Sequence, residues 1–246
     1  MVRVYFILCH REFSSIWDHP LLVRNLPRDL YRLAHKIGQP ELPLLVRRFI
    51  FGILNPHFPT PVVEVPIDNL PHITENVYVY NSARVVYYAP SDVSGLKGMH
   101  QERIRSTRSW YGGHHRHDCV FIGNSDSPDA PGFKGLLVAR VFLFLSIRYD
   151  GINHPCALVH WFSPLGDAPD DETGMWVVKP DYLTGKKRFF EVIHLDTILR
   201  GAHLIGVMGL GFLPSNPKVD YLTSLDSFKS FYVNKYADHH AHEIAF

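Results

Sequence analysis

The sequence has few cysteines, no long apolar run and no CxxC pair. Its 246 residues include only Cys9, Cys119 and Cys156 as thiols. An odd number of dispersed cysteines argues against a disulfide framework and favours a reducing compartment. The apolar stretches are shorter than the roughly 18 residues that a membrane-spanning helix needs. The apolar run at residues 4–9 is also too short for a secretory signal. We therefore expect an intracellular protein that does not contact a membrane.

A strong charge of one sign is also missing. The chain has 25 basic and 24 acidic residues, which gives a formal net charge of +1 with histidine neutral. A dedicated nucleic-acid binder usually shows a marked basic excess, so any contact with phosphates has to come from a local cluster. The 46% hydrophobic content is ordinary for a folded domain. We see no internal repeat and no low-complexity tract.

The most regular part of the chain is the stretch from Leu136 to Asp181. Two apolar runs flank Asp150-Gly151, and a third apolar run covers Met175 to Val178. An Asp-Gly pair between strand-like runs predicts a tight hairpin, because the primed turns need positive φ at both central residues. The sequence therefore predicts a β-rich core built on this hairpin.

The rest of the chain divides into three parts. We predict an N-terminal helical segment at 1–54, of which 1–20 is unassigned, a proline-rich connector at 55–76 and a β-rich domain at 77–246. Within these parts the patterns predict a helix at 41–54, a strand at 77–89 with a bend at Asn81-Ser82, a short helix at 99–106 and a last helix at 220–236.

These elements predict an α+β fold. It is a mainly antiparallel β-barrel or sandwich between about 77 and 210, with N-terminal helices and a closing C-terminal helix. The strand pattern is similar to that of SH3-like or bromo-adjacent-homology (BAH-like) barrels. That similarity does not indicate a function, because barrels of this kind occur in proteins with many unrelated functions.

Two basic segments are candidates for nucleic-acid contact. Arg47 and Arg48 lie on the predicted helix 41–54. The second segment contains Arg103, Arg105 and Arg108, followed by Trp110. Arginines interleaved with aromatic rings bind phosphates and stack on bases. The alternative for the first segment is a solvated helix face, and for the second a surface turn with Trp110 packed on the barrel.

The C-terminal string is the strongest candidate for a metal site. His239, His242 and Glu243 carry imidazole and carboxylate groups, which are good zinc ligands, and His239 and Glu243 share one face of a continuing helix. The alternative is a polar helix end, where histidine suits the helix dipole. We expect no cofactor, and no catalytic residues are assigned.

Several longer motifs point to a family. These are YAPSDVSGLKGMHQERIRST from Tyr88, ALVHWF from Ala157, DxxTGMWVVKPD from Asp170, VIHLDTILRGAHLIGV from Val192 and FYVNKYADHHAHEIAF from Phe231. Over roughly residues 40 to 246 the chain resembles the C-terminal region, after the catalytic core, of Plavaka-type DDE transposon proteins of mushroom-forming fungi.

The resemblance implies a DDE transposase, in which three acidic residues on an RNase H-like core bind two divalent metals for DNA strand transfer. That core lies upstream of the matching region, and none of the three acidic residues can be placed on this chain. The resemblance therefore implies a detached C-terminal portion, with a nuclear location and with duplex DNA, chromatin protein or the transposase core as partner.

Three functions remain open from the sequence. We favour a non-enzymatic accessory module that contacts DNA or chromatin protein. The alternatives are a metal-dependent nuclease that uses the His-rich tail, and a decayed transposon remnant without activity.

Overall fold

The fold is α+β, with a mostly antiparallel and nearly closed β-barrel and short helices at its ends. The predicted fold class is confirmed. The computed structural model describes residues 23, 25–89, 97–208 and 223–246, and the account below covers these residues alone. All strand pairs among them are antiparallel.

The elements are named in chain order. The helices are α1 (Leu30–Ile37), α2 (Leu42–Leu54), α3 (Ser224–Ser227) and α4 (His239–Ala245), and the short 3-10 turns are η1 (Val62–Glu64), η2 (Ile67–Asn69), η3 (Gly132–Gly135) and η4 (Leu195–Thr197). The strands are β1 (Val77–Tyr80), β2 (Ser82–Tyr88), β3 (Met99–Thr107), β4 (Arg116–His117), β5 (Cys119–Gly123), β6 (Leu136–Tyr149), β7 (Ile152–Pro164), β8 (Val177–Pro180), β9 (Tyr182–Leu183), β10 (Lys187–Arg188), β11 (Phe190–His194), β12 (Ile198–Ala202), β13 (Leu204–Gly206) and β14 (Phe231–Val233).

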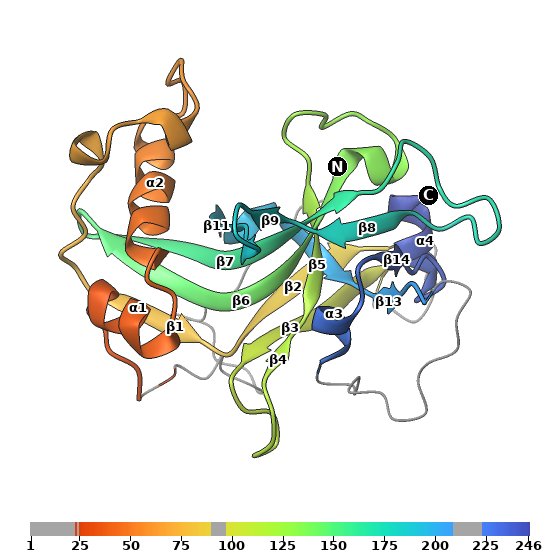
Figure 1. Cartoon of the computed structure of the whole chain (residues 1–246), viewed down its shortest axis with the longest axis horizontal. Coiled ribbons are helices and arrows are strands. Elements are labelled where there is room, and N and C mark those ends of the chain that lie inside the picture. The colour runs from red at the N-terminus through yellow and green to blue at the C-terminus, as the bar shows by residue number, and fades with distance from the viewer. Residues whose placement is uncertain (1–22, 24, 90–96, 209–222) are drawn as a thin grey trace.

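The predicted hairpin is the central feature of the barrel. β6 and β7 pair along almost their whole length, and Asp150 and Gly151 both adopt positive φ, 50° and 74°, as the primed turn requires. One half of β6 pairs with β5 and the other half with β1, while β7 pairs in turn with β8 and β11. The hairpin therefore joins both ends of the molecule (Figure 1).

A β-bulge interrupts this hairpin at Phe142, where the register with β7 shifts between Val141 and Leu143. A bulge inserts one extra residue, so the alternation of side chains changes phase. Val141 and Phe144 consequently share the apolar cluster on one face. On the other face Arg140 lies between two separate apolar clusters.

Three hydrophobic clusters fill the molecule, and β6 and β7 contribute to each. The helix-side cluster includes Leu33, Val46, Ile50, Leu145 and Leu158. The interior cluster includes Val85, Ile104, Val141, Phe144 and Val159. The C-terminal cluster includes Phe121, Val138, Phe162, Trp176 and Phe231.

The two N-terminal helices have clear local signals. Asp29 caps α1 by accepting from the backbone N–H of Arg32 at 2.8 Å, and Gly38 ends the helix with φ 70°. In α2, Pro43 stands in the first turn, where no backbone donor is needed. The predicted helix 41–54 is confirmed.

Two of the predicted helices are wrong. The segment 99–106 lies in strand β3, which pairs with β2 from Met99 to Arg105 and places Ile104 in the interior cluster. The segment 220–236 is not one helix: after the short α3, Phe231 begins strand β14, which pairs with β8 and β13. Residues 220–222 lie outside the described residues. The closing helix is α4 instead.

The N-terminal helices are packed on the barrel. Leu33 of α1 and Ile50 of α2 belong to the same cluster as Leu145 and Leu158 of the central hairpin. Proline-rich residues 55–76 form the two short turns η1 and η2 between α2 and β1. The division of the chain at this segment stays a prediction.

Candidate functional site

The loop between β3 and β4, residues 108–115, projects from the barrel and is called the β3–β4 loop here. It extends at the bottom of Figure 1. Arg108 is exposed, and the Tyr111 side chain is 91% exposed at φ 50°. The loop is tied to α1, because Arg108 Nη2 donates to the carbonyl of Lys36 at 3.2 Å.

Trp110 is the centre of a stacked cluster at the base of this loop. The guanidinium carbons of Arg105 and Arg116 lie 4.6 and 5.1 Å from its ring centroid, and Tyr111 meets it edge-on at 4.6 Å. Such cation–π contacts hold an arginine in place without neutralising it. We call Arg105, Trp110 and Arg116 the Trp110 cluster.

The carboxylate of Asp118 holds two arginines of this cluster in place. Asp118 accepts from the backbone N–H of Arg105 at 2.9 Å and from Arg116 Nε at 2.7 Å. Burial, and then the nearby Arg116, lower the pKa of Arg105 below its ordinary value. Residues 103–118 contain four arginines and one acidic residue, Asp118.

The structure separates the two predicted basic segments. Arg103, Arg105, Arg108 and Trp110 do lie together, on β3 and its loop. Arg47 does not join them. Its side chain is buried, and it donates to the carbonyls of Pro71 at 2.9 Å, Ile67 at 2.6 Å and Leu70 at 2.8 Å.

Arg48, its neighbour, donates to the carbonyl of Val63 at 3.0 Å. Both α2 arginines therefore fasten the proline-rich segment to the helix. For Arg47 the phosphate-contact prediction does not fit the structure, because a guanidinium that is buried against three carbonyls cannot reach a polyanion.

The C-terminal tail does not form the predicted metal site. His239 and His242 are exposed on α4. Among the described residues no group of three or more His, Cys, Asp or Glu side chains is arranged to hold a metal ion. The tail instead holds Asp238 and His240 against the barrel, and the sequence analysis missed His240.

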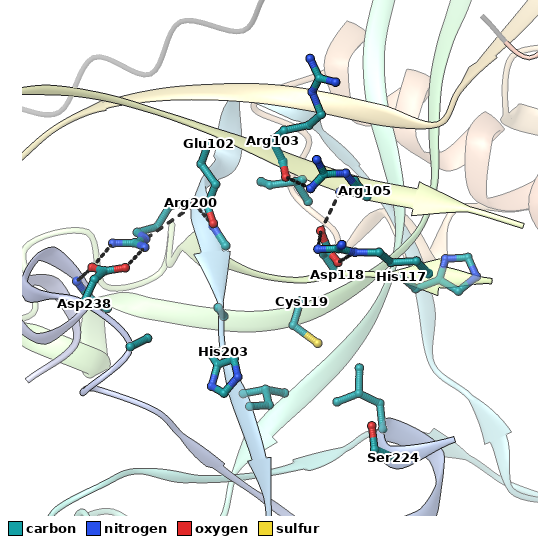
Figure 2. A pocket seen from close by; sticks show the side chains of 18 of the residues that line it. Glu102, Arg103, Arg105, His117, Asp118, Cys119, Arg200, His203, Ser224 and Asp238 are labelled. Atoms are coloured by element: carbon teal, nitrogen blue, oxygen red, sulfur yellow. Dashed lines mark hydrogen bonds and ion pairs between the residues drawn. The ribbon is translucent and has the colours of Figure 1, made fainter. Parts of the chain in front are cut away.

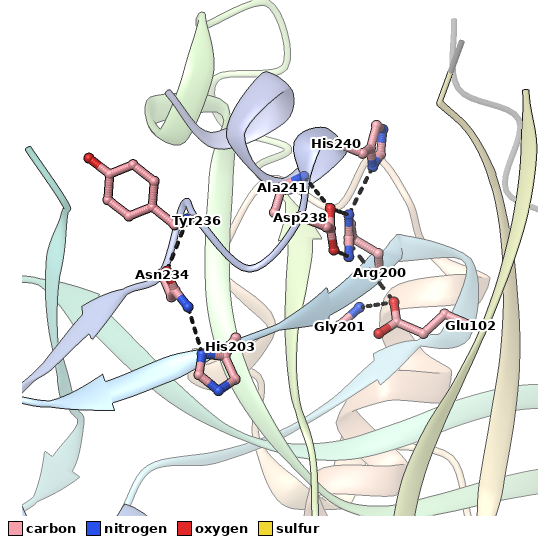
Figure 3. Close-up of polar contacts among 9 residues, drawn as sticks. All are labelled: Glu102, Arg200, Gly201, His203, Asn234, Tyr236, Asp238, His240 and Ala241. Atoms are coloured by element: carbon pink, nitrogen blue, oxygen red, sulfur yellow. Dashed lines mark hydrogen bonds and ion pairs between the residues drawn. The ribbon is translucent and has the colours of Figure 1, made fainter. Parts of the chain in front are cut away.

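Figure 3 shows how this tail is held. Arg200 of β12 is buried and donates to both carboxylate oxygens of Asp238, at 2.8 and 2.5 Å. The His240 Nδ1 lies 3.2 Å from Arg200 Nη1, and the His240 ring stacks on Tyr87 at 4.7 Å. Hydrogen bonding by Arg200 lowers the pKa of Asp238. The pair fixes α4 to β12.

A cavity of about 600 Å³ lies beside this pair, between β3, β12 and the start of α4 (Figure 2). It is lined by four arginines and by three carboxylates, Glu102, Asp118 and Asp238. Arg200 pairs with Asp238, Arg116 pairs with Asp118, and Glu102 accepts from the backbone N–H of Gly201 at 2.9 Å. The charges in this cavity are therefore largely compensated.

The sequence analysis also missed Arg140, a 3% exposed residue in the middle of β6. Its Nη1 donates to Asp226 at 2.9 Å, and its guanidinium lies 5.2 Å from the Phe142 ring. Its Nε has no hydrogen-bond partner among the described residues. One charged residue inside the apolar run 136–147 is the signal that marks it, because such residues are almost never buried without a partner.

His117 lies beside Arg140 and stacks on Phe142 at 4.8 Å. Burial first, and then the charge of Arg140, lower its pKa to about 4, so the ring is neutral at pH 7. Its Nδ1 lies 2.9 Å from Ser106 Oγ and 3.1 Å from the carbonyl of Val141. A carbonyl only accepts, so Nδ1 carries the proton and cannot deprotonate Ser106. The pair does not form a serine nucleophile with its base.

The described cysteines are also not activated. Cys119 and Cys156 are buried and unpaired. Burial raises the pKa of Cys119 to about 12 and that of Cys156 well above its ordinary value. These two thiols are therefore inert, while Cys9 lies outside the described residues.

No helix in the described part of the chain has the length and apolar character needed to cross a lipid bilayer. Comparison with protein-family models, with curated proteins and with solved structures finds no match for this chain.

Proposed function

We propose that this chain is a non-enzymatic accessory module of a transposase and that it contacts duplex DNA through the β3–β4 loop and the Trp110 cluster. The resemblance to Plavaka-type proteins motivates the transposase origin. The nuclear location belongs to the same proposal. The observation that carries the DNA contact is the projecting β3–β4 loop, which exposes Arg108 and the Tyr111 ring above the arginines of the Trp110 cluster.

Charge supports this surface. Arg103, Arg105, Arg108 and Arg116 lie between residues 103 and 118, where Asp118, which accepts from Arg116, is the one acidic residue of that stretch of the sequence. The chain as a whole is nearly neutral, at +1. A local positive field on a nearly neutral molecule attracts phosphates to one face, while the rest of the surface does not attract them.

Pre-organisation supports it as well. Stacking on Trp110 fixes the guanidinium of Arg105, and the carbonyl of Lys36 fixes that of Arg108. Arginines that are already ordered lose less side-chain entropy when they bind a phosphate. The rigid base and the exposed tip at Tyr111 suit a contact along the DNA backbone.

The test is fluorescence anisotropy of a labelled duplex over a salt series. We expect log K to fall linearly with log salt, with a slope of about −0.9 for each phosphate contact. The Arg105→Ala plus Arg108→Ala variant should reduce the magnitude of this slope by about 2. The affinity should fall uniformly across duplex sequences, because phosphate contacts carry no sequence information.

The matched control is Lys134→Ala plus Lys179→Ala. It removes the same charge from η3 and β8, where both side chains are exposed. This control should leave the slope unchanged. Equal losses in the two double variants would mean that only net charge matters. No binding at low salt would overturn the DNA proposal and would favour a protein partner or an inactive remnant.

A further inference from the structure

We propose that a second cavity, centred on Arg140, binds a small organic anion with a phosphate or carboxylate head and an apolar body. The cavity has a volume of about 830 Å³ and lies between α1, the β3–β4 loop and β6. We call it the Arg140 cavity. The proposal does not rest on DNA binding, because it is argued from the charges and the walls of this cavity alone.

Charge is the first argument. Four cationic side chains line the Arg140 cavity, and Asp226 is the only acidic one among the described residues that line it. The cations are Lys36, Arg108, Arg140 and Arg188. Asp226 accepts from Arg140 at 2.9 Å and from Arg188 at 2.6 Å, so one carboxylate is divided between two guanidiniums.

The burial of Arg140 makes this imbalance significant. A buried charge is costly unless it is paired and its donors are satisfied. Arg140 is 3% exposed, divides its acid with Arg188 and has an unpartnered Nε. An anion in the cavity would supply the missing negative charge, and Arg guanidiniums bind phosphate and carboxylate oxygens with matching geometry.

The shape and the walls indicate the rest of the ligand. Leu26, Ile37, Leu143, Leu158 and the ring of Phe142 line the cavity beside the charged groups. The bulge at Phe142 creates this arrangement, since it brings Arg140, Phe142 and Leu143 to one face of β6. A pocket of about 300–1,000 Å³ with apolar walls and a few convergent polar groups is typical of small-molecule sites.

The neighbouring cavity of about 600 Å³ is an internal comparison. There Arg116 and Arg200 each have a carboxylate of their own. In the Arg140 cavity two arginines divide one carboxylate, while Lys36 and Arg108 have no acidic partner that the structure records. Four arginines and three carboxylates line the neighbouring cavity, against four cations and one carboxylate in the Arg140 cavity. The excess of positive charge is therefore larger in the Arg140 cavity.

The experiment is isothermal titration of the full chain with phenyl phosphate, benzoate, inorganic phosphate and phenol. We expect saturable binding of phenyl phosphate and benzoate, weaker binding of inorganic phosphate and none of phenol. If phenyl phosphate and phenol bind alike, or if phenyl phosphate does not saturate, the proposal fails. The relative affinity of phenyl phosphate and benzoate distinguishes a phosphate source from a carboxylate source.

Two variants locate the site. Arg188→Gln removes one cation and should weaken phenyl phosphate binding about tenfold, the effect of one charge-assisted hydrogen bond. Ile37→Trp should fill the recess and abolish binding, with circular dichroism to check that α1 is retained. The control is Arg148→Gln on the same strand β6, where Arg148 is 52% exposed beside Glu75. A loss in the control equal to that in Arg188→Gln would place binding elsewhere.

The two proposals fail separately. Ile37→Trp should leave the affinity for duplex DNA unchanged, and Arg116→Ala, which does not line the Arg140 cavity, should leave phenyl phosphate binding unchanged. DNA binding without phenyl phosphate binding overturns only the inference on the cavity. Phenyl phosphate binding without DNA binding overturns only the proposed function.

Discussion

The arginines of α2 and those of the β3–β4 hairpin are alike in sequence and unlike in structure. Arg47 is buried against three backbone carbonyls of the proline-rich segment. Arg105 instead stacks on Trp110, and Arg108 is exposed at the edge of a projecting loop. The difference is the number of carbonyl partners: three carbonyls occupy the donors of Arg47, whereas Arg105 and Arg108 each donate to a single carbonyl and keep other N–H groups available. The number of basic residues alone does not identify a binding surface.

The largest expected effect is on the α2 side. Arg47→Met removes the donor of three carbonyls in one step and should destabilise the fold by about 3–4 kcal/mol, because each orphaned acceptor costs about 1–3 kcal/mol. Chemical denaturation measures this loss. DNA affinity, measured on the folded protein, should not change.

The control for this prediction is Arg148→Met, whose surface ion pair with Glu75 should be worth less than about 1 kcal/mol. If Arg47→Met weakens DNA binding and leaves the stability intact, the comparison between the two arginine groups breaks down.

A second effect, on the pH dependence of stability, is expected at His117 of β4, whose ring is neutral at pH 7. Its folded pKa of about 4 lies below the value of about 6.5 in an unfolded chain. Between these values the unfolded state binds more protons, so the free energy of unfolding falls as the pH drops from about 6.5 to 4. The share of His117 is on the order of 2–3 kcal/mol.

The measurement is a series of denaturation curves between pH 7 and 4 for wild type and His117→Asn. Asparagine keeps a donor for the carbonyl of Val141 and cannot titrate, so the acid loss should be smaller in the variant. Burial lowers the pKa of His154, His160 and His240 as well, so part of the loss should persist. Identical pH profiles would show that His117 is not the group responsible.

The smallest effect is expected next to Arg47. Arg48 donates one hydrogen bond, to the carbonyl of Val63, and its buried Nε has no partner among the described residues. Arg48→Ala should therefore cost no more than about 1 kcal/mol by denaturant titration, since one hydrogen bond is lost and one orphaned donor is removed. A loss as large as that of Arg47→Met would show that the two neighbours are equally structural.

Local signals in the sequence predicted the elements that local interactions decide. Asp150-Gly151 determines the hairpin turn by its own backbone preferences, and Pro43 starts α2. The errors at 99–106 and 220–236 concern strands whose pairing is distant. β3 is a strand because β2 lies beside it, and Phe231 is in a strand because β8 offers Val178 as partner. A short apolar pattern does not distinguish helix from strand without that partner.

The candidate site was predictable in part for the same reason. The order of Arg103, Arg105, Arg108 and Trp110 in the sequence identifies a basic and aromatic segment without further information, although not its strand conformation. The Arg140 cavity could not be predicted in this way. Arg140, Arg188 and Asp226 belong to β6, β10 and α3 and come together only in the folded chain. Only the odd charge inside an apolar run indicated that Arg140 has a special role.

The long hairpin has a consequence for how the molecule opens. Residues of β6 and β7 belong to all three hydrophobic clusters, so no cluster separates from the others while the hairpin stays paired. Amide protons in the centre of β6 and β7 should therefore exchange with solvent only when the whole chain unfolds, whereas those of the β3–β4 loop exchange through local fluctuations. The β3–β4 loop can then fluctuate while the paired strands β6 and β7 stay intact.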